Sequence, residues 1–250
     1  MDKMTVKTPK EIEIMTEGGK KLARIRDEAA KAVKAGMTTA QLDKLVDDLI
    51  AKAGGQASFK MVRGYHHATC ININDTVVHG MPGAYKIKAG DKVGIDLGLY
   101  YKGYHTDTSV TIGDDRYEKF LQVGRDALQL AIAQARPGKR IADISRAMQQ
   151  TVEAAGYSAV RALTGHGIGK FLHEEPAIPC FTVGKYEHSP KIVPGMVLAI
   201  EIMYNEGKFE VAYKNDDGWT IATADGKISG LFEETVAVTK SGPQVLTQSR

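Results

Sequence analysis

Acidic residues and one histidine stand where their neighbours are apolar residues or glycines. Asp96 ends the run GDKVGID, Glu201 ends the run GMVLAIE, and Glu233 precedes the alternating segment TVAV. Burying an unpaired carboxylate is costly, so acids in such segments usually have a partner. The candidate metal ligands in this pattern are Asp96, Asp107, His166, Glu201 and Glu233.

Asp96 and Asp107 lie on the two arms of a predicted β-hairpin. The segments VGIDLGLYY and YHTDTSV flank Lys102-Gly103, a pair that is typical of a two-residue turn. In that register Gly98 pairs with Asp107, and Asp96 becomes its diagonal neighbour on one face, about 7–8 Å away at the backbone. Adjacent carboxylates repel each other, and a cation between them removes the repulsion.

These ligand types predict a pair of divalent metal ions and hydrolytic chemistry. Carboxylates and an imidazole without thiolates suit Mn, Fe, Co or Zn rather than a structural zinc site built from cysteines. His166 lies in TGHGIG, whose glycines let the backbone approach an ion or a substrate closely. Two ions about 3.5–4 Å apart would activate a water molecule as the nucleophile.

Each of these residues has a commoner explanation when it is taken alone. An isolated aspartate at a strand end usually caps a turn, and an isolated histidine usually packs in a core. The segment GHGIG alone also fits a phosphate-binding loop. The metal site is favoured because all five residues occur together, in segments that recur in both halves of the chain.

The elements that must position these residues occur twice along the chain. Capping signals and apolar periodicity predict helices over 9–33, from 38 or 39 to the glycines at 54–55, over 115–134 and over 141–155. A His-x-x-Pro motif follows each helix pair, at His79 and His173, and each motif precedes an acid at the end of an apolar strand. The duplication predicts an α+β fold of two pseudo-symmetric halves, with a curved, mostly antiparallel sheet covered by helices and one shared cleft.

The length of 250 residues and the ordinary composition predict one catalytic domain over 1–250. The net charge of +3 is too small to indicate nucleic-acid binding without a basic stripe, and Lys20-Lys21 fits a solvated helix face. The first residues carry no apolar signal segment and the longest apolar runs are of strand length, so we expect a cytoplasmic protein without a membrane span. Cys70 and Cys180 are expected to be free thiols.

The order of the motifs resembles that of methionine aminopeptidases. HGMP with His79, GIDLG, HTDTS, GHGIG, HEEP with His173, AIE and FEET follow the order of that family, and the similarity covers nearly the whole chain. The stretch from His173 to Glu201 is too short for the insertion of type II enzymes and no N-terminal extension is present, so type I is expected. The resemblance implies a pita-bread fold and the removal of the initiator methionine from nascent proteins.

The resemblance also implies how the metal ions are held. Asp107 and Glu233 would bridge two divalent ions, and Asp96, His166 and Glu201 would complete their ligands. The identity of the ions stays open among Co, Mn, Fe and Zn.

Three catalytic groups and a substrate pocket follow from the same resemblance. Glu201 would accept a proton from the attacking water, His173 would hydrogen-bond the scissile carbonyl, and His79 would contact the departing amide. Plain core packing is the alternative for Cys70 and for Trp219. The residues implied to bind the substrate methionine are Phe59, Val62, Tyr65, Cys70, His79, Leu172, His173 and Trp219.

Three positions depart from the family pattern. Glu234 stands where a histidine is usual, Leu172 stands where a phenylalanine is usual, and a proline is usual near His66. Strand alternation lets only one of the adjacent Glu233 and Glu234 face the ions, and the motif match favours Glu233. His66 and His67 either line the mouth of the cleft or belong to an exposed loop.

Two other functions stay open at this point. A proline-directed aminopeptidase of the same fold would usually carry a further N-terminal domain, and a non-catalytic binding protein on this scaffold would usually have lost metal ligands. For the methionine aminopeptidase we expect a monomer whose partners are nascent polypeptide N-termini, met at the ribosome without direct contact to nucleic acid.

Overall fold

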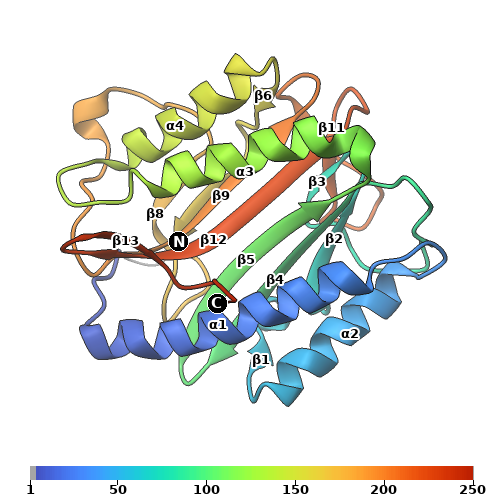
Figure 1. The fold of residues 1–250 in the computed structure, drawn as a ribbon, viewed down its shortest axis with the longest axis horizontal. Helices are drawn as coiled ribbons and strands as arrows, with labels where there is room; N and C mark the ends of the chain where they lie inside the picture. Colours follow the sequence, from blue (N-terminus) through green and yellow to red (C-terminus); the bar gives the residue numbers. More distant parts are fainter. Residues whose placement is uncertain (1–3, 250) are drawn as a thin grey trace.

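A ten-stranded sheet runs through the molecule, and helices lie against it (Figure 1). The computed structural model describes residues 4–249 of the chain. Helix α1 lies across β4 and β5, and α3 lies across β9 and β12 (Figure 1). The helices are α1 (Pro9–Ala32), α2 (Thr39–Lys52), α3 (Glu118–Ile132) and α4 (Ile141–Ala154), with short 3-10 turns at Phe59–Met61, Asp115–Tyr117 and Tyr186–His188.

The strands of the large sheet follow the order β1-β4-β5-β12-β9-β7-β8, with β2 beside β4, β6 beside β9 and β13 beside β12. A small second sheet has the order β10-β11-β3. All pairings between the described strands are antiparallel, which confirms the predicted α+β fold. The strands are β1 (Gln56–Ala57), β2 (Thr69–Ile73), β3 (Thr76–Val78), β4 (Val93–Tyr101), β5 (Tyr104–Ile112), β6 (Ser158–Ala159), β7 (Thr164–Gly167), β8 (Glu174–Pro179), β9 (Val197–Asn205), β10 (Val211–Tyr213), β11 (Ile221–Thr223), β12 (Ser229–Thr239) and β13 (Gly242–Val245).

The helix predictions hold with one correction. Helix α1 begins at the predicted capping box, in which the Thr8 hydroxyl accepts from Glu11 N and the Glu11 carboxylate accepts from Thr8 N. The helix expected over 115–134 begins three residues later, because residues 115–117 form a 3-10 turn that the Asp114 side chain caps. That helix ends at Ile132, two residues earlier than expected.

The two halves repeat each other in their backbone conformation. Gly54 and Gly156 follow α2 and α4 with φ of 80° and 85°. Gly90 and Gly195 precede β4 and β9 with φ of 87° and 91°, a region in which other residues are strained. These equivalent turns confirm the predicted pseudo-symmetry.

The expectation that Asp96 and Glu201 end their strands was wrong, whereas the hairpin predicted over 93–101 gave the observed extent of β4. Strand β4 continues to Tyr101 and β9 continues to Asn205, so both acids lie inside their strands. The strands run on because the residues that follow, such as Leu97 and Ile202, are fully buried and keep a face to pack. Each acid is therefore held on both sides by a backbone ladder.

Each half has its own apolar core between its helix pair and the sheet. Leu42 and Ile95 belong to the core under α1 and α2, and Met148 and Leu198 belong to the core under α3 and α4. All of them are fully buried, and each such side chain contributes about 1.5–3 kcal/mol to stability. Across residues 4–249, no helix has both the length and the apolar character needed to cross a membrane.

Candidate active site

The β4–β5 hairpin places two of the candidate ligands as its sequence predicts. Lys102 and Gly103 form the turn with φ of 48° and 91°, and Gly98 pairs with Asp107. Asp96 pairs with Ser109, so the two aspartates are diagonal neighbours on one face of the hairpin.

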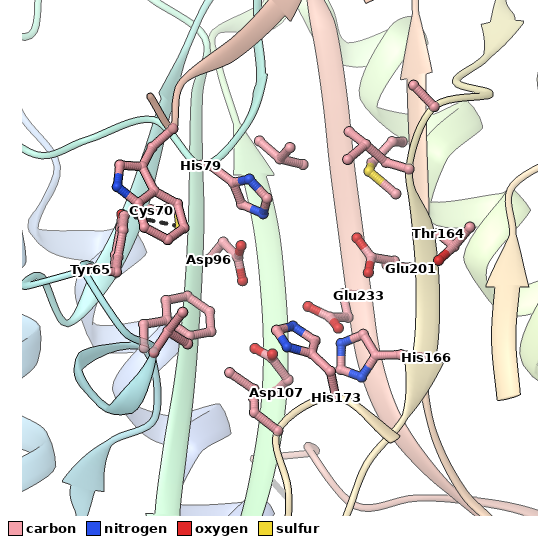
Figure 2. A pocket seen from close by; sticks show the side chains of 18 residues that line it. Tyr65, Cys70, His79, Asp96, Asp107, Thr164, His166, His173, Glu201 and Glu233 are labelled. Atoms are coloured by element: carbon pink, nitrogen blue, oxygen red, sulfur yellow. Dashed lines mark hydrogen bonds between the residues drawn. The ribbon is translucent and has the colours of Figure 1, made fainter. Parts of the chain in front are cut away.

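A single row across the sheet carries three of the acids. Asp96 on β4 pairs with Ser109 on β5, Ser109 pairs with Glu233 on β12, and Glu233 pairs with Glu201 on β9. Residues that face each other across an antiparallel pair share one face of the sheet. Figure 2 shows these three carboxylates and that of Asp107 directed toward one space.

His166 reaches the same space from β7. It pairs with Ala199 on β9, and an added Cβ at the preceding Gly165 would lie 2.6 Å from Ala199 O. Glycine at this position therefore lets the histidine strand come close to β9. The Nδ1 atom lies 2.9 Å from Gly167 O, and because a carbonyl can only accept, Nδ1 carries the proton and Nε2 keeps its lone pair.

The candidate ligands converge in a buried cluster. One ligand atom from each of Asp107, His166 and Glu233 lies within 4.8 Å of the other two. Asp96 and Glu201 line the same cavity, whose volume is about 340 Å³.

Burial makes the ionised form of every carboxylate here costly. Burial raises the pKa of Asp96 to about 7, and burial with the charge of Asp96 raises the pKa of Glu201 well above its usual range. The pKa of Asp107 is raised by burial and by Asp96, and that of Glu233 by burial and by Asp107. Four acids that repel each other need protons or cations between them.

Two further histidines lie beside the cluster, His79 near Asp96 and His173 between Asp107 and His166 (Figure 2). His79 follows β3 with φ of 56°, and its ring lies 6.4 Å from the ring of Trp219. The ring of His173 meets that of His166 edge-on at 4.5 Å. Burial lowers the pKa of His79 to about 4 and also lowers that of His173, so both are neutral at pH 7.

His173 is anchored through its neighbour to the start of the chain. Lys7 Nζ donates to Glu174 Oε2 at 2.7 Å, and the two side chains are 4% and 1% exposed. Thr5 Oγ1 donates to the same oxygen, and Phe171 N donates to Glu174 Oε1 at 3.3 Å. The segment ahead of α1 thereby holds the loop that presents His173.

All the residues predicted to bind methionine line this one cavity: Phe59, Val62, Tyr65, Cys70, His79, Leu172, His173 and Trp219. Tyr65 meets Trp219 edge-on at 5.0 Å. The Tyr65 hydroxyl lies 2.8 Å from Thr69 O and 3.2 Å from Cys70 Sγ, which fixes the thiol at the wall. Cys70 thus both packs in the core and borders the cavity.

Sequence reasoning missed five residues of the cavity: Val78, Ala162, Leu163, Thr164 and Met203. Thr164 had a usable signal, because it lies two residues before His166 on β7 and so shares its face. Ala162 and Leu163 precede that strand and have no periodicity that could place them.

The matches to known proteins agree with this geometry. A model described as metallopeptidase family M24 matches residues 13–240. The chain is 41% identical to a methionine aminopeptidase of Clostridium perfringens, over 97% of this chain and 98% of that one. This chain belongs to the methionine aminopeptidases of family M24. It is also 40% identical to methionine aminopeptidase 1 of Bacillus subtilis, over 97% of this chain and 98% of that one.

Solved structures of the family have the same fold. Methionine aminopeptidase from Thermotoga maritima superposes with a TM-score of 0.92 at 38% identity, covering 98% of this chain and 99% of that one. Prolidase from Pyrococcus furiosus has a TM-score of 0.78 at 22% identity, covering 98% of this chain and 66% of that one, and shares the fold alone. The fold is therefore the pita-bread fold of M24 peptidases.

Membership of a metallopeptidase family implies a divalent metal cofactor, and the residues of this cavity fit one. Asp96 Oδ1 and Ser109 Oγ are buried without a hydrogen-bond partner among the described residues. A cation near Asp96 would satisfy its oxygen and keep the neighbouring carboxylates ionised. The site is built from oxygen and imidazole donors, which suits borderline divalent ions.

Glu234 faces away from this cluster, unlike Glu233. Its carboxylate accepts from Arg26 Nη1 at 2.8 Å and from the hydroxyl of Thr247. Glu234, which stands where the family usually has a histidine, is therefore paired with Arg26 on α1. His66 is exposed, and His67 packs edge-on against Tyr65 at 5.7 Å.

Proposed function

We propose that this chain removes the N-terminal methionine from newly made proteins by hydrolysis at a dinuclear metal centre. The observation that carries the proposal is the convergence of three buried carboxylates, the half-buried Glu201 and His166 beside an apolar pocket with an aromatic edge. Relatives of similar length that are named methionine aminopeptidases support the substrate.

Five residues would hold the metal ions: Asp96, Asp107, His166, Glu201 and Glu233. Asp107 and Glu233 would bridge two ions, since they lie on either side of the junction between the halves. Mn, Fe, Co and Zn all suit these donors. Bound ions of this kind lower the pKa of water toward neutrality and polarise a carbonyl.

The chain's own groups would then guide the proton and the substrate. Glu201 would accept the proton of the attacking water and pass it toward the departing amine. His173 would donate a hydrogen bond to the scissile carbonyl, and His79 would contact the departing amide. Donors aimed at a developing oxyanion typically contribute about 10²–10³ in rate each.

The pocket beside the cluster would select the methionine side chain. Phe59, Tyr65 and Trp219 give it an aromatic edge, and sulfur–aromatic contacts favour a thioether. Leu172 and Cys70 add an apolar wall.

The wider setting of the reaction belongs to the same proposal. The chain would act as one catalytic domain over 1–250, as a monomer in the cytoplasm, on nascent chains at the ribosome. The type I class rests on the stretch from His173 to Glu201, which is too short for the insertion of type II enzymes.

Peptide hydrolysis tests the proposal against the proline-directed alternative. Purified protein is incubated with Met-Gly-x and x-Pro peptides, without metal and with Mn, Co or Fe. We expect release of methionine from Met-Gly-x only when metal is present. Cleavage restricted to x-Pro peptides would favour the prolidase type. No cleavage of either peptide with any of the metals would favour a binding protein.

A further inference from the structure

The junction between the two halves is built differently from the rest of the sheet. Strands β4 and β5 are paired over nine residues, and so are β9 and β12. Within residues 4–249, the regular pairing between β5 and β12 is the single pair Ser109–Glu233. The two halves therefore meet where the backbone ladder is almost absent.

Threonine hydroxyls replace the missing ladder. Thr235 Oγ1 accepts from Asp107 N at 2.9 Å and donates to Asp107 O at 2.7 Å. Thr111 Oγ1 accepts from Leu231 N at 3.0 Å and donates to Leu231 O at 2.7 Å. A hydroxyl placed between two backbones holds them farther apart than a direct N–H to C=O bond would.

The Thr235 bridge acts on Asp107, which is the diagonal neighbour of Glu233 across the junction. Thr235 holds both backbone groups of Asp107 and stands two residues after Glu233. Thr108, next to Asp107, donates from its hydroxyl to Glu233 O at 2.9 Å. Thr235 and Thr108 are fully buried, so water does not compete for these hydrogen bonds.

We propose that Thr235 is a positioning residue, which sets the separation of the Asp107 and Glu233 carboxylates and so holds two metal ions at bridging distance. The proposal rests on the dinuclear centre proposed above. Metal–ligand distances tolerate only about ±0.2 Å, so a change in strand separation weakens binding. Removing the hydroxyl would also leave Asp107 N–H and C=O unpaired in a buried place.

Thr111 provides a matched control within the same junction. Thr111 and Thr235 each stand two residues beyond the Ser109–Glu233 pair, on opposite strands. Both hydroxyls make the same two hydrogen bonds, and both side chains are buried. The partner of Thr111 is Leu231, which carries no ligand, so its loss should cost stability alone.

Metal titration separates the positioning role of Thr235 from the purely structural role of Thr111. Wild type, Thr235→Val, Thr235→Ser and Thr111→Val are stripped of metal and titrated with Mn²⁺ by calorimetry. We expect Thr235→Val to weaken binding of at least one ion by about 10–100-fold, the range typical when a residue that supports a metal ligand is changed. Thr235→Ser and Thr111→Val should bind two ions with wild-type affinity, although Thr111→Val should melt at a lower temperature.

Electron paramagnetic resonance of the Mn-loaded proteins gives a second readout that stability alone would not move. Wild type and Thr111→Val should show an exchange-coupled Mn pair, and Thr235→Val should show uncoupled Mn. If Thr235→Val does not fold, Thr108→Val is measured instead with the same expectation. Unchanged Mn²⁺ affinity and coupling in the folded variant overturn the inference, whereas a wild type that binds no Mn²⁺ overturns the proposed function itself.

Discussion

His166 is the residue whose chemistry is most constrained by its surroundings. Its Nδ1–H donates a hydrogen bond to Gly167 O, and burial lowers the pKa of the ring to about 3. The ring is therefore neutral, and its Nε2 lone pair is free to bind a metal. We expect His166→Ala to abolish turnover of Met-Gly-x. It should weaken Mn²⁺ binding by more than the roughly 10–100-fold that is typical when a residue supporting a metal ligand is changed. Calorimetric titration and metal analysis measure the effect.

The control for this prediction is His188→Ala, since His188 is exposed on a 3-10 turn. Both variants should keep the wild-type circular dichroism spectrum. Full activity and full metal content in His166→Ala would remove this residue from the ligand set.

The candidate ligands could be predicted because carboxylates within apolar strands are rare and have few explanations. Val78, Leu163 and Met203 could not be predicted as cavity residues, because apolar residues near strands look alike in a sequence. The hydrogen bonds from Thr235 to Asp107 could not be predicted either. A threonine hydroxyl has no pattern that shows whether it bonds its own strand or the next one.

At the scale of elements, the capping box of α1 gives a pH-dependent prediction. Hydrogen bonds from Thr8 N, from the hydroxyl of Tyr104 and from the hydroxyl of Thr8 lower the pKa of Glu11 to about 2. Its charged form therefore stabilises the fold above the unfolded pKa near 4.5, and this contribution is lost as the pH falls toward 2. Glu11→Gln should cost about 1 kcal/mol at pH 7, and the difference from wild type should shrink below pH 4.5.

Thermal melts of wild type and Glu11→Gln across this pH range measure the effect. Glu13→Gln, at an exposed position of the same helix, is the matched control and should show no such difference. A constant difference between Glu11→Gln and wild type at every pH would contradict the assigned role.

The close approach of β7 to β9 gives a second prediction at this scale. Gly165→Ala would place a methyl group 2.6 Å from Ala199 O, so one strand must shift and His166 with it. We expect a loss of about 1–3 kcal/mol in stability and weaker Mn²⁺ binding. Gly83→Ala, where the added methyl meets open space, should change neither. Wild-type metal affinity in Gly165→Ala would show that metal binding does not depend on the close approach of β7 to β9.

The hairpin that carries Asp96 and Asp107 was predictable down to its register, because Lys102-Gly103 allows only a tight turn between two alternating segments. The same prediction gave the length of β4. The length of β9 was not predicted, because packing under α3 continues this strand beyond Glu201. Tertiary packing, which has no local signal, decided where β9 ends.

For the whole molecule, the raised pKa values make stability depend on metal and pH. Metal-free protein binds a proton at Asp96 up to about pH 7, whereas the unfolded chain loses it near 3.8. The folded state therefore holds more protons in this window, so the stability of metal-free protein should fall as the pH rises from about 4 to 7. Asp96→Asn should reduce this fall in thermal melts. An identical pH profile in the variant would contradict the assignment.

Metal should reverse that trend, because the ions replace the protons. At neutral pH and 100 times the Kd, Mn²⁺ should stabilise the fold by about 2.7 kcal/mol, which raises Tm by roughly 5–10 °C for a domain of this size. Differential scanning calorimetry with and without Mn²⁺ measures the shift. Magnesium at the same concentration is the control, and an equal shift with it would argue against a site selective for borderline ions.

The duplication of the fold could be predicted because Gly54 and Gly156 end equivalent helices and only glycine adopts their backbone readily. The way in which the two halves join could not be predicted. The junction depends on the hydroxyls of Thr111 and Thr235, and a comparison of the halves within the sequence does not show contacts between them.

The dry ion pair between Lys7 and Glu174 limits how the molecule can open. Pulling these two charges apart without water would cost several kcal/mol, so the loop with His173 and the residues ahead of α1 must travel as one body. Any opening of the cavity on that side therefore also displaces Thr5 and Lys7, which lie ahead of α1. A spin label at position 4, where Met4 is exposed, would report the movement of His173 from outside the cavity.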